Sequence, residues 1–168
     1  EADQGTDVKD VKLWIFNADD GSLVEEKHYG SAQEVASQRF QLPEGTYRIL
    51  TTTNLTEPFF ISEQTRALTN WNNIQIGLTN PKDVKDNAYF GVTDVRIDNK
   101  EGCYVVQNPV KSVLAELTII IENVPKGTEM SGKALDAAWC LFPTQKNSDG
   151  DYGLPSIKPT EVELPTLL

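Results

Sequence analysis

The sequence has a single histidine, His28, and only two cysteines, Cys103 and Cys140. An ordinary zinc site takes its four ligands mainly from cysteine and histidine, so these three side chains are too few to build one. A Ser-His-Asp triad would have to use His28, and no nucleophile motif lies near it. We therefore expect no catalytic residue, no metal and no cofactor, and we interpret His28 as a solvated residue at the end of a strand.

Long apolar runs and basic clusters are also missing. The longest apolar run, residues 137–142, is far shorter than the roughly 20 residues that cross a bilayer as a helix. Acidic residues number 25 against 15 basic ones, which gives a net charge of −10. Such a surface repels phosphate backbones and anionic lipids, so we expect no nucleic-acid partner. Because the apolar runs are short, we also expect no transmembrane segment in the visible chain. The chain begins at Glu1 without a methionine, and we expect any signal sequence to lie upstream of it.

Two adjacent carboxylates, Asp19 and Asp20, lie within the stretch VKLWIFNADDGSLVEEKHY, residues 11–29, and raise the question of an acidic site. The residues before them alternate as in an extended strand, and Asp20-Gly21 is a dipeptide typical of hairpin turns. Adjacent carboxylates at an exposed turn lack the burial and the unlike environments that separate two catalytic pKa values. We therefore predict a β-hairpin here and no acidic site.

Strand patterns separated by turn residues dominate the rest of the chain. FQLPEGTYRIL predicts a second hairpin around Pro43-Glu44-Gly45, and Ser31 with Glu34 has the spacing of a helical capping box. The longest alternation, VLAELTIIIENV at residues 113–124, predicts a central core strand. About eight to ten short strands without long helices indicate an all-β fold, an antiparallel β-sandwich with short helical turns in its loops.

The two cysteines lie far apart in the sequence, each in an apolar, strand-like context. We interpret Cys103 and Cys140 as buried thiols that face the core and do not react in the folded protein, because cysteine packs as a small hydrophobic residue. The alternative is a disulfide between them, which an oxidising compartment would favour.

Three tryptophans could form a platform on which a sugar stacks. Trp14 and Trp139 lie within strand patterns, so we predict that they pack in the core. Trp71 lies in the polar sequence Asn70-Trp71-Asn72-Asn73, and we predict that it is the exposed one and the candidate ligand-stacking residue. A carbohydrate-binding surface module is therefore an alternative function. A third hypothesis is a glycan-processing enzyme that uses two dispersed carboxylates.

The order of several strand motifs resembles a known family. A strand ending in a D-G turn (VKLWIFNADDGSLV) precedes a strand with L-P-x-G-x-Y (FQLPEGTYRILTTTN). An aromatic-Gly strand (AYFGVTDVRI) and a strand that closes on proline (AELTIIIENVP) follow. Over residues 11–125 this order resembles the N-terminal domain of the fimbrillin-like pilus subunits and fimbrial anchor proteins of Bacteroides-type bacteria.

The resemblance implies a transthyretin-like, Greek-key β-sandwich without catalytic residues, acting as a fimbrial accessory or anchor subunit in pilus assembly and adhesion. It also implies export as a lipoprotein to the bacterial outer membrane and cell surface, with the lipidated cysteine upstream of residue 1. Other fimbrial subunits, joined by β-strand addition, are the implied partners, with a host or glycan ligand as a further one. We expect residues 1–10 to be a polar lead and residues 11–168 to form a single β-sandwich domain, without the family's second domain.

Residues 160–168 contain the last candidate strand. Val162 and Leu164 alternate with glutamates, and Pro165 removes a backbone donor, which confines the segment to a sheet edge. Unpaired edges recruit further strands. We therefore predict a marginal edge strand for assembly, or a bridge toward a partner, and not a core strand.

Overall fold

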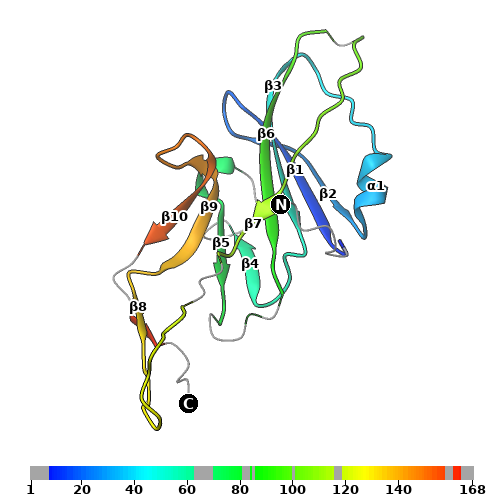
Figure 1. Ribbon diagram of the computed structural model, residues 1–168. Coiled ribbons are helices and arrows are strands. Elements are labelled where there is room, and N and C mark those ends of the chain that lie inside the picture. The colour runs from blue at the N-terminus through cyan, green and yellow to red at the C-terminus, as the bar shows by residue number, and fades with distance from the viewer. Residues whose placement is uncertain are drawn as a thin grey trace.

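The computed structural model describes residues 8–62, 70–80, 84, 86–99, 101–115, 119–157 and 161–163. Short strands dominate these residues, together with one helix, α1 (Ala32–Ala36), and one 3-10 turn, η1 (Trp71–Asn73) (Figure 1). The strands are β1 (Val11–Asn17), β2 (Leu23–Tyr29), β3 (Gly45–Thr53), β4 (Phe59–Ser62), β5 (Gln75–Leu78), β6 (Tyr89–Ile97), β7 (Lys111–Ser112), β8 (Lys133–Leu135), β9 (Ala138–Lys146), β10 (Tyr152–Ile157) and β11 (Glu161–Glu163).

Strand pairing gives two larger sheets and one small one. The first sheet has the order β2-β1-β3-β6-β7, the second has the order β10-β9-β5-β4, and β11 pairs with β8 by itself. The described pairings are all antiparallel. The two larger sheets form a sandwich, and the β8–β11 ladder projects below them in Figure 1. The antiparallel β-sandwich expected from the sequence is confirmed.

The predicted opening hairpin is present as β1 and β2. Its turn closes through hydrogen bonds from the Asn17 N–H to the Ser22 carbonyl and from the Gly21 N–H to the Asn17 carbonyl, both 2.9 Å long. Gly21 has a φ of 76°, which glycine adopts at little steric cost. Hydrogen bonds from the hydroxyl and the backbone of Ser22 hold the pKa of Asp20 below its ordinary value. Asp20 is therefore a turn residue, as predicted.

The short helix α1 begins with the predicted capping box. The backbone N–H of Glu34 donates to Oγ of Ser31 at 3.3 Å, and the Glu34 carboxylate accepts from the N–H of Gly30 at 3.0 Å. These two bonds satisfy backbone donors that have no partner inside a helix. Val35 of this helix packs on the outer side of the first sheet, against a cluster that contains Val11, Leu13 and Ile15.

Both faces of β1 are buried, which explains its almost continuous apolar sequence. One face carries Val11, Leu13 and Ile15, which pack under α1 and the chain that follows it. The other face carries Trp14 and Phe16, which pack between the sheets with Leu50 and Ile74. Burying each such side chain contributes about 1.5–3 kcal/mol of transfer free energy. A third cluster extends the core along the second sheet and consists of Leu55, Phe59, Ile76, Ala88 and Phe90.

The prediction of a central core strand at residues 113–124 is wrong. In the described parts, residues 113–115 and 119–124, the backbone forms no strand. Ile119, Ile120 and Ile121 are 55%, 78% and 55% exposed. The first sheet instead ends at β7, whose two residues pair with the start of β6. Alternation identifies residues that could share a buried face, but burial also requires a partner surface.

The chain before β7 lies across the first sheet and does not extend it. Nδ2 of Asn108 donates to the Ile49 carbonyl at 3.3 Å, to Oγ1 of Thr51 at 2.9 Å and to the Gly91 carbonyl at 3.2 Å. Gly91 permits this approach, because a Cβ at that position would lie 2.3 Å from the Pro109 carbonyl oxygen. These contacts fix the segment over β3 and β6, so only two residues of β7 reach the sheet edge.

Candidate functional site

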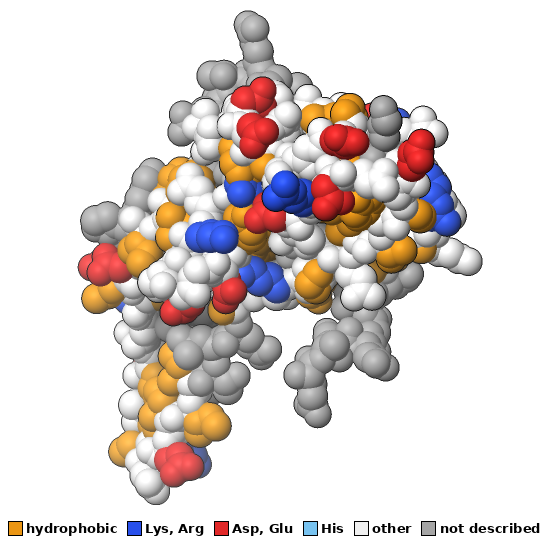
Figure 2. Space-filling view, turned by 90° about the horizontal axis from the view of Figure 1, so that it is seen from above, with side chains coloured by type: hydrophobic (Ala, Val, Ile, Leu, Met, Phe, Trp, Pro, Cys, Tyr) orange, Lys and Arg blue, Asp and Glu red, His pale blue; other side chains and the backbone are white. Residues whose placement is uncertain are grey.

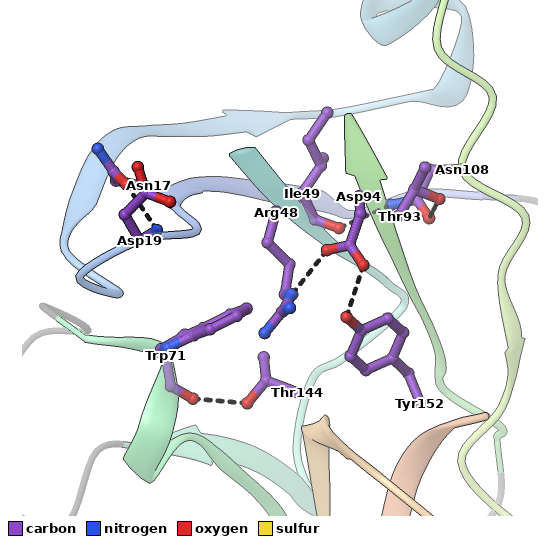
Figure 3. Close-up of polar contacts among 10 residues, drawn as sticks. All are labelled: Asn17, Asp19, Arg48, Ile49, Trp71, Thr93, Asp94, Asn108, Thr144 and Tyr152. Carbon is purple, nitrogen blue, oxygen red and sulfur yellow. Dashed lines mark hydrogen bonds and ion pairs between the residues drawn. The ribbon is translucent and has the colours of Figure 1, made fainter. Parts of the chain in front are cut away.

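Side chains from both large sheets meet at Arg48 in β3 (Figure 3). The register between β3 and β6 places Arg48 opposite Asp94, and Nε of Arg48 donates a 2.8 Å hydrogen bond to Oδ1 of Asp94. The hydroxyl of Tyr152, in β10 of the second sheet, donates to Oδ2 of the same carboxylate at 2.8 Å. One carboxylate therefore links the two sheets.

Two aromatic rings flank the guanidinium of Arg48. Its Cζ lies 3.0 Å from the centroid of the Trp71 ring and 5.0 Å from that of the Tyr152 ring. Nζ of Lys146, at the end of β9, also lies 5.0 Å from the Tyr152 centroid. Cations attract the electron-rich faces of aromatic rings. We call Arg48, Trp71, Asp94, Lys146 and Tyr152 the Arg48 cluster.

The Arg48 cluster fixes the protonation of its carboxyl and its phenol. Burial opposes ionisation of Asp94, but hydrogen bonds from Arg48 and Tyr152 and the positive charges of Arg48 and Lys146 outweigh it and lower its pKa. Burial, followed by the hydrogen bond donated to Asp94, raises the pKa of Tyr152 to about 12. At neutral pH Asp94 is thus an acceptor and Tyr152 a donor. Neither group is poised to exchange a proton with a substrate near neutral pH.

Trp71 is half-buried and tied to the opening hairpin. Its backbone N–H donates to the Gly21 carbonyl at 3.1 Å, and its carbonyl accepts from Oγ1 of Thr144 at 2.5 Å. A Cβ at Gly21 would lie 2.4 Å from Cδ1 of the indole, so the ring edge abuts the turn. Arg48 covers the ring, as Figure 3 shows. The structure thus places the sequence-predicted stacking residue in a contact between the sheets.

One face of the molecule is of mixed charge. Figure 2 shows acidic and basic side chains interspersed with hydrophobic ones over one face of the molecule. Opposite charges that alternate in this way produce no extended field of one sign. The Arg48 cluster contains two cations and one carboxylate, and its contacts join strands of both sheets.

The other two tryptophans differ from each other. Trp14 is 2% exposed, so its predicted place in the core is confirmed. Trp139 is 40% exposed, so the prediction that it packs in the core is wrong. Trp139 lies in β9, near the end of the second sheet, and its Nε1 donates to Oγ of Ser156 at 3.2 Å. The strand assignment was correct, but the alternation did not show which part of the strand the partner sheet covers.

The two cysteines also occupy different environments. Neither forms a disulfide: Cys140 is buried in β9, and Cys103 is exposed. The expectation of two buried thiols is therefore wrong for Cys103. The chain around Cys103 forms no strand, and nearby Val105 is 90% exposed. The apolar sequence around Cys103 therefore does not indicate a buried segment.

The remaining sequence candidates are His28 and the last strand. The side chain of His28 is 63% exposed, and its Nε2 contacts Oδ1 of Asp10. Val162 lies in β11, opposite Ala134 of β8. Leu164 lies outside the described residues. In the described residues no group of three or more histidine, cysteine or acidic side chains is placed to hold a metal ion.

Sequence reasoning missed Arg48, Asp94 and Tyr152. They come from β3, β6 and β10, and no spacing along the chain relates them. The one available signal was that Arg48 is the single charged residue, and Asp94 the single acidic residue, of its strand. Only the strand register shows that the two are opposite each other. No helix in the described chain is long and apolar enough to cross a membrane.

Solved structures from two Bacteroides species are similar to this chain. A putative adhesin from Bacteroides ovatus is 20% identical, with a TM-score of 0.49, over 64% of this chain and 40% of that one. From Bacteroides thetaiotaomicron, a putative polysaccharide binding protein is 16% identical, with a TM-score of 0.42, over 55% and 36% of the two chains. A putative adhesin from the same species is 17% identical, with a TM-score of 0.43, over 54% and 34%. This chain therefore spans less than half the length of each structure.

Comparison of sequences gives the family. A search among curated proteins found no significant match. A sequence model of the fimbrillin-A associated anchor proteins Mfa1 and Mfa2 matches residues 1–163, which is nearly the whole chain. The match extends well beyond residues 11–125, on which the resemblance in the strand motifs rests. The chain belongs to the family of fimbrillin-A associated anchor proteins.

Proposed function

We propose that this protein is a non-enzymatic accessory or anchor subunit of fimbriae at the bacterial outer membrane, where it acts in pilus assembly and adhesion. The observation that carries the proposal is the family match over residues 1–163. The Arg48 cluster supports it, because a subunit under mechanical load benefits from side chains that tie its two sheets together. Export as a lipoprotein, with the signal upstream, is part of the proposal.

Other fimbrial subunits are the proposed partners, joined by strand addition at the β8–β11 ladder. In the described residues each of these two strands has one paired side, so the opposite backbone edge can receive a strand. Exposed aliphatic residues lie in the preceding chain and in the ladder, among them Ile120 at 78% and Leu135 at 65%. Apolar side chains beside an open edge favour the docking of an apolar strand.

Deletion of the gene in the source bacterium tests the anchoring role. We expect fewer cell-attached fimbriae by electron microscopy, weaker adhesion to surfaces, and restoration of both by the wild-type gene. The protein should appear in the outer-membrane fraction and be accessible to protease on intact cells. Unchanged numbers of attached fimbriae, or recovery of the protein only inside the cell, would contradict the proposal.

Hydrogen exchange tests the contact with other subunits. With purified fimbrial subunits added, the amides of Lys133–Leu135 and Glu161–Glu163 should gain protection. Ile120→Asp should weaken the association, and Val105→Asp is the matched control, because Val105 is another aliphatic residue, 90% exposed. Protection gained only elsewhere, or equal effects of both substitutions, would argue against docking at this ladder.

A second candidate function is carbohydrate binding at the partly exposed aromatic residues of the Arg48 cluster. The observation that favours it is the proximity of Trp71 and Tyr152 to the same guanidinium. Trp71→Ala should then abolish specific binding on a glycan array while the protein stays folded by circular dichroism. Retained binding in this variant would remove Trp71 from consideration as a ligand-stacking residue.

A further inference from the structure

A cavity of about 370 Å³ lies at one end of the sandwich, away from the Arg48 cluster. Three connections line it: the loop from β3 to β4, the residues after β5, and the residues before β6. Its lining residues include Asn54, Glu57, Phe59, Thr79, Asn80 and Asp86. Its volume is within the range of roughly 300–1,000 Å³ typical of small-ligand sites. We call it the loop-end cavity.

Backbone and side-chain hydrogen bonds hold the walls of the loop-end cavity in place. The Pro58 carbonyl accepts two hydrogen bonds from Thr79, one from the backbone N–H at 2.9 Å and one from Oγ1 at 3.1 Å. Oδ1 of Asn54 accepts from the N–H of Lys9 at 3.0 Å. The N–H of Asn54 donates to the Asp10 carbonyl at 2.8 Å. A cavity fixed in this way loses little conformational entropy when a ligand enters.

The wall chemistry favours a neutral, hydroxyl-rich ligand. Glu57 and Asp86 supply carboxylate acceptors, whose negative charges repel an anion, and Asn80 supplies an amide. Ca2+ takes roughly six to eight oxygen ligands, and the described residues contain no group of three or more acidic, histidine or cysteine side chains placed to hold a metal ion. A lipid chain would leave these polar groups without partners.

We propose that the loop-end cavity binds a short, uncharged saccharide. Sugar hydroxyls donate to the carboxylates of Glu57 and Asp86 and also accept from amides, so one ligand class satisfies both kinds of wall group. Phe59 lines the cavity and is 5% exposed, so it contributes a small apolar patch to the wall. This site does not involve Trp71, and it does not depend on the proposed role in anchoring.

A titration followed by 15N–1H NMR on the full chain tests this site. The probes are D-glucose, D-galactose, D-mannose and their disaccharides, with N-acetylneuraminic acid as an anionic comparison and CaCl2 as a cation comparison. We expect at least one neutral probe to shift the amide signals of Asn54, Phe59, Thr79, Asn80 and Asp86 in a saturable manner. Neither comparison should shift the same set.

Substitutions at the wall provide the matched controls. Asp86→Ala and Asn80→Ala should each weaken binding of the shifting probe about tenfold, because each removes a hydrogen bond to the ligand. Asp149→Ala, in the distant β9–β10 turn, should leave it unchanged. If the Asp86→Ala variant does not fold, the Asp86→Asn variant is used in its place, because it keeps the shape of the side chain. Shifts centred on Trp71, shifts caused by CaCl2 alone, or no shift with any neutral probe would overturn the proposal.

Discussion

The guanidinium of Arg48 lies over the ring of Trp71, with 3.0 Å between Cζ and the ring centroid. Arg48 belongs to the first sheet, and Trp71 belongs to η1, which directly precedes β5 of the second sheet. This contact and the carboxylate of Asp94 therefore join the two layers of the sandwich at the same place. The contribution of the Arg48 cluster to the stability of the fold can be measured.

Arg48→Ala should lower the free energy of unfolding by about 1–3 kcal/mol. The substitution removes the contact with Trp71 and a charge-assisted hydrogen bond to Asp94, and it removes buried side-chain stem as well. Urea denaturation at neutral pH measures the change. Lys27→Ala is the control, because its 2.9 Å ion pair with Glu25 is exposed and exposed ion pairs contribute little to stability. Equal effects would show that the Arg48 cluster is an ordinary surface ion pair.

Asp94 should make the folded protein sensitive to acid. Its pKa in the folded state is below the ordinary 3.8, so the folded state binds fewer protons than the unfolded state as the pH falls past that value. The stabilisation is therefore complete above the unfolded pKa and is lost as the pH falls through the folded pKa. Asp94→Asn should flatten the stability curve in this acidic range, as measured by urea denaturation. An unaltered pH slope in the variant would exclude Asp94 as the source.

Tyr152 should make the protein sensitive to alkali. Its pKa is raised from 10.0 to about 12 in the folded state, so the unfolded chain loses this proton first. The associated stability is fully present below about pH 10 and is lost as the pH rises through about 12. Tyr152→Phe should remove part of this loss, which thermal unfolding over that pH range can detect. An identical loss of stability in the variant would exclude Tyr152 as the source.

Gly21→Ala should destabilise the protein more than Gly150→Ala does. Both glycines have positive φ, 76° and 86°, so each substitution should cost about 1 kcal/mol in backbone strain. Only at Gly21 would the new Cβ also clash, at 2.4 Å from Trp71; nothing lies within 4 Å at Gly150. Crowding adds about 1–3 kcal/mol. Equal melting temperatures for the two variants would show that the indole moves away freely.

One thiol should react in the native protein and two should react after unfolding. Cys103 is exposed and Cys140 is buried, so iodoacetamide should first add a single group. Mass spectrometry before and after denaturation counts the adducts, and peptide mapping locates them. Labelling of Cys140 at the same rate as Cys103 would show that β9 opens readily.

Some local signals predicted the local structure, but the hairpin expected at Pro43-Glu44-Gly45 is wrong, because residues 38–44 form no strand and β3 pairs with β1 and β6. The turn at Asp20-Gly21 and the cap at Ser31 depend on residues close in sequence, whose side chains bond to neighbouring backbone groups. The burial of Trp14 followed from a strand whose two faces are both apolar. In such cases residues close in sequence determine the local structure, and the structure confirms the prediction.

Long-range relationships were beyond the reach of the sequence. Cys103 and residues 119–121 have strand-like surroundings, but their burial depends on whether another strand covers them. The pairing of Arg48 with Asp94 depends on the register of two strands that are far apart in the chain. A single sequence shows neither which surface covers a residue nor how two distant strands are aligned. The candidate site could therefore be identified only from the structure.

The exposed residues Ile119, Ile120 and Ile121 have a consequence for the colloidal behaviour of the protein. At neutral pH a net charge of −10 keeps molecules apart and opposes contact between these side chains. As the carboxylates gain protons near pH 4, that repulsion disappears while the apolar segment stays exposed. Light scattering should therefore increase in mild acid before the fold is lost, and Ile120→Asp should delay the increase.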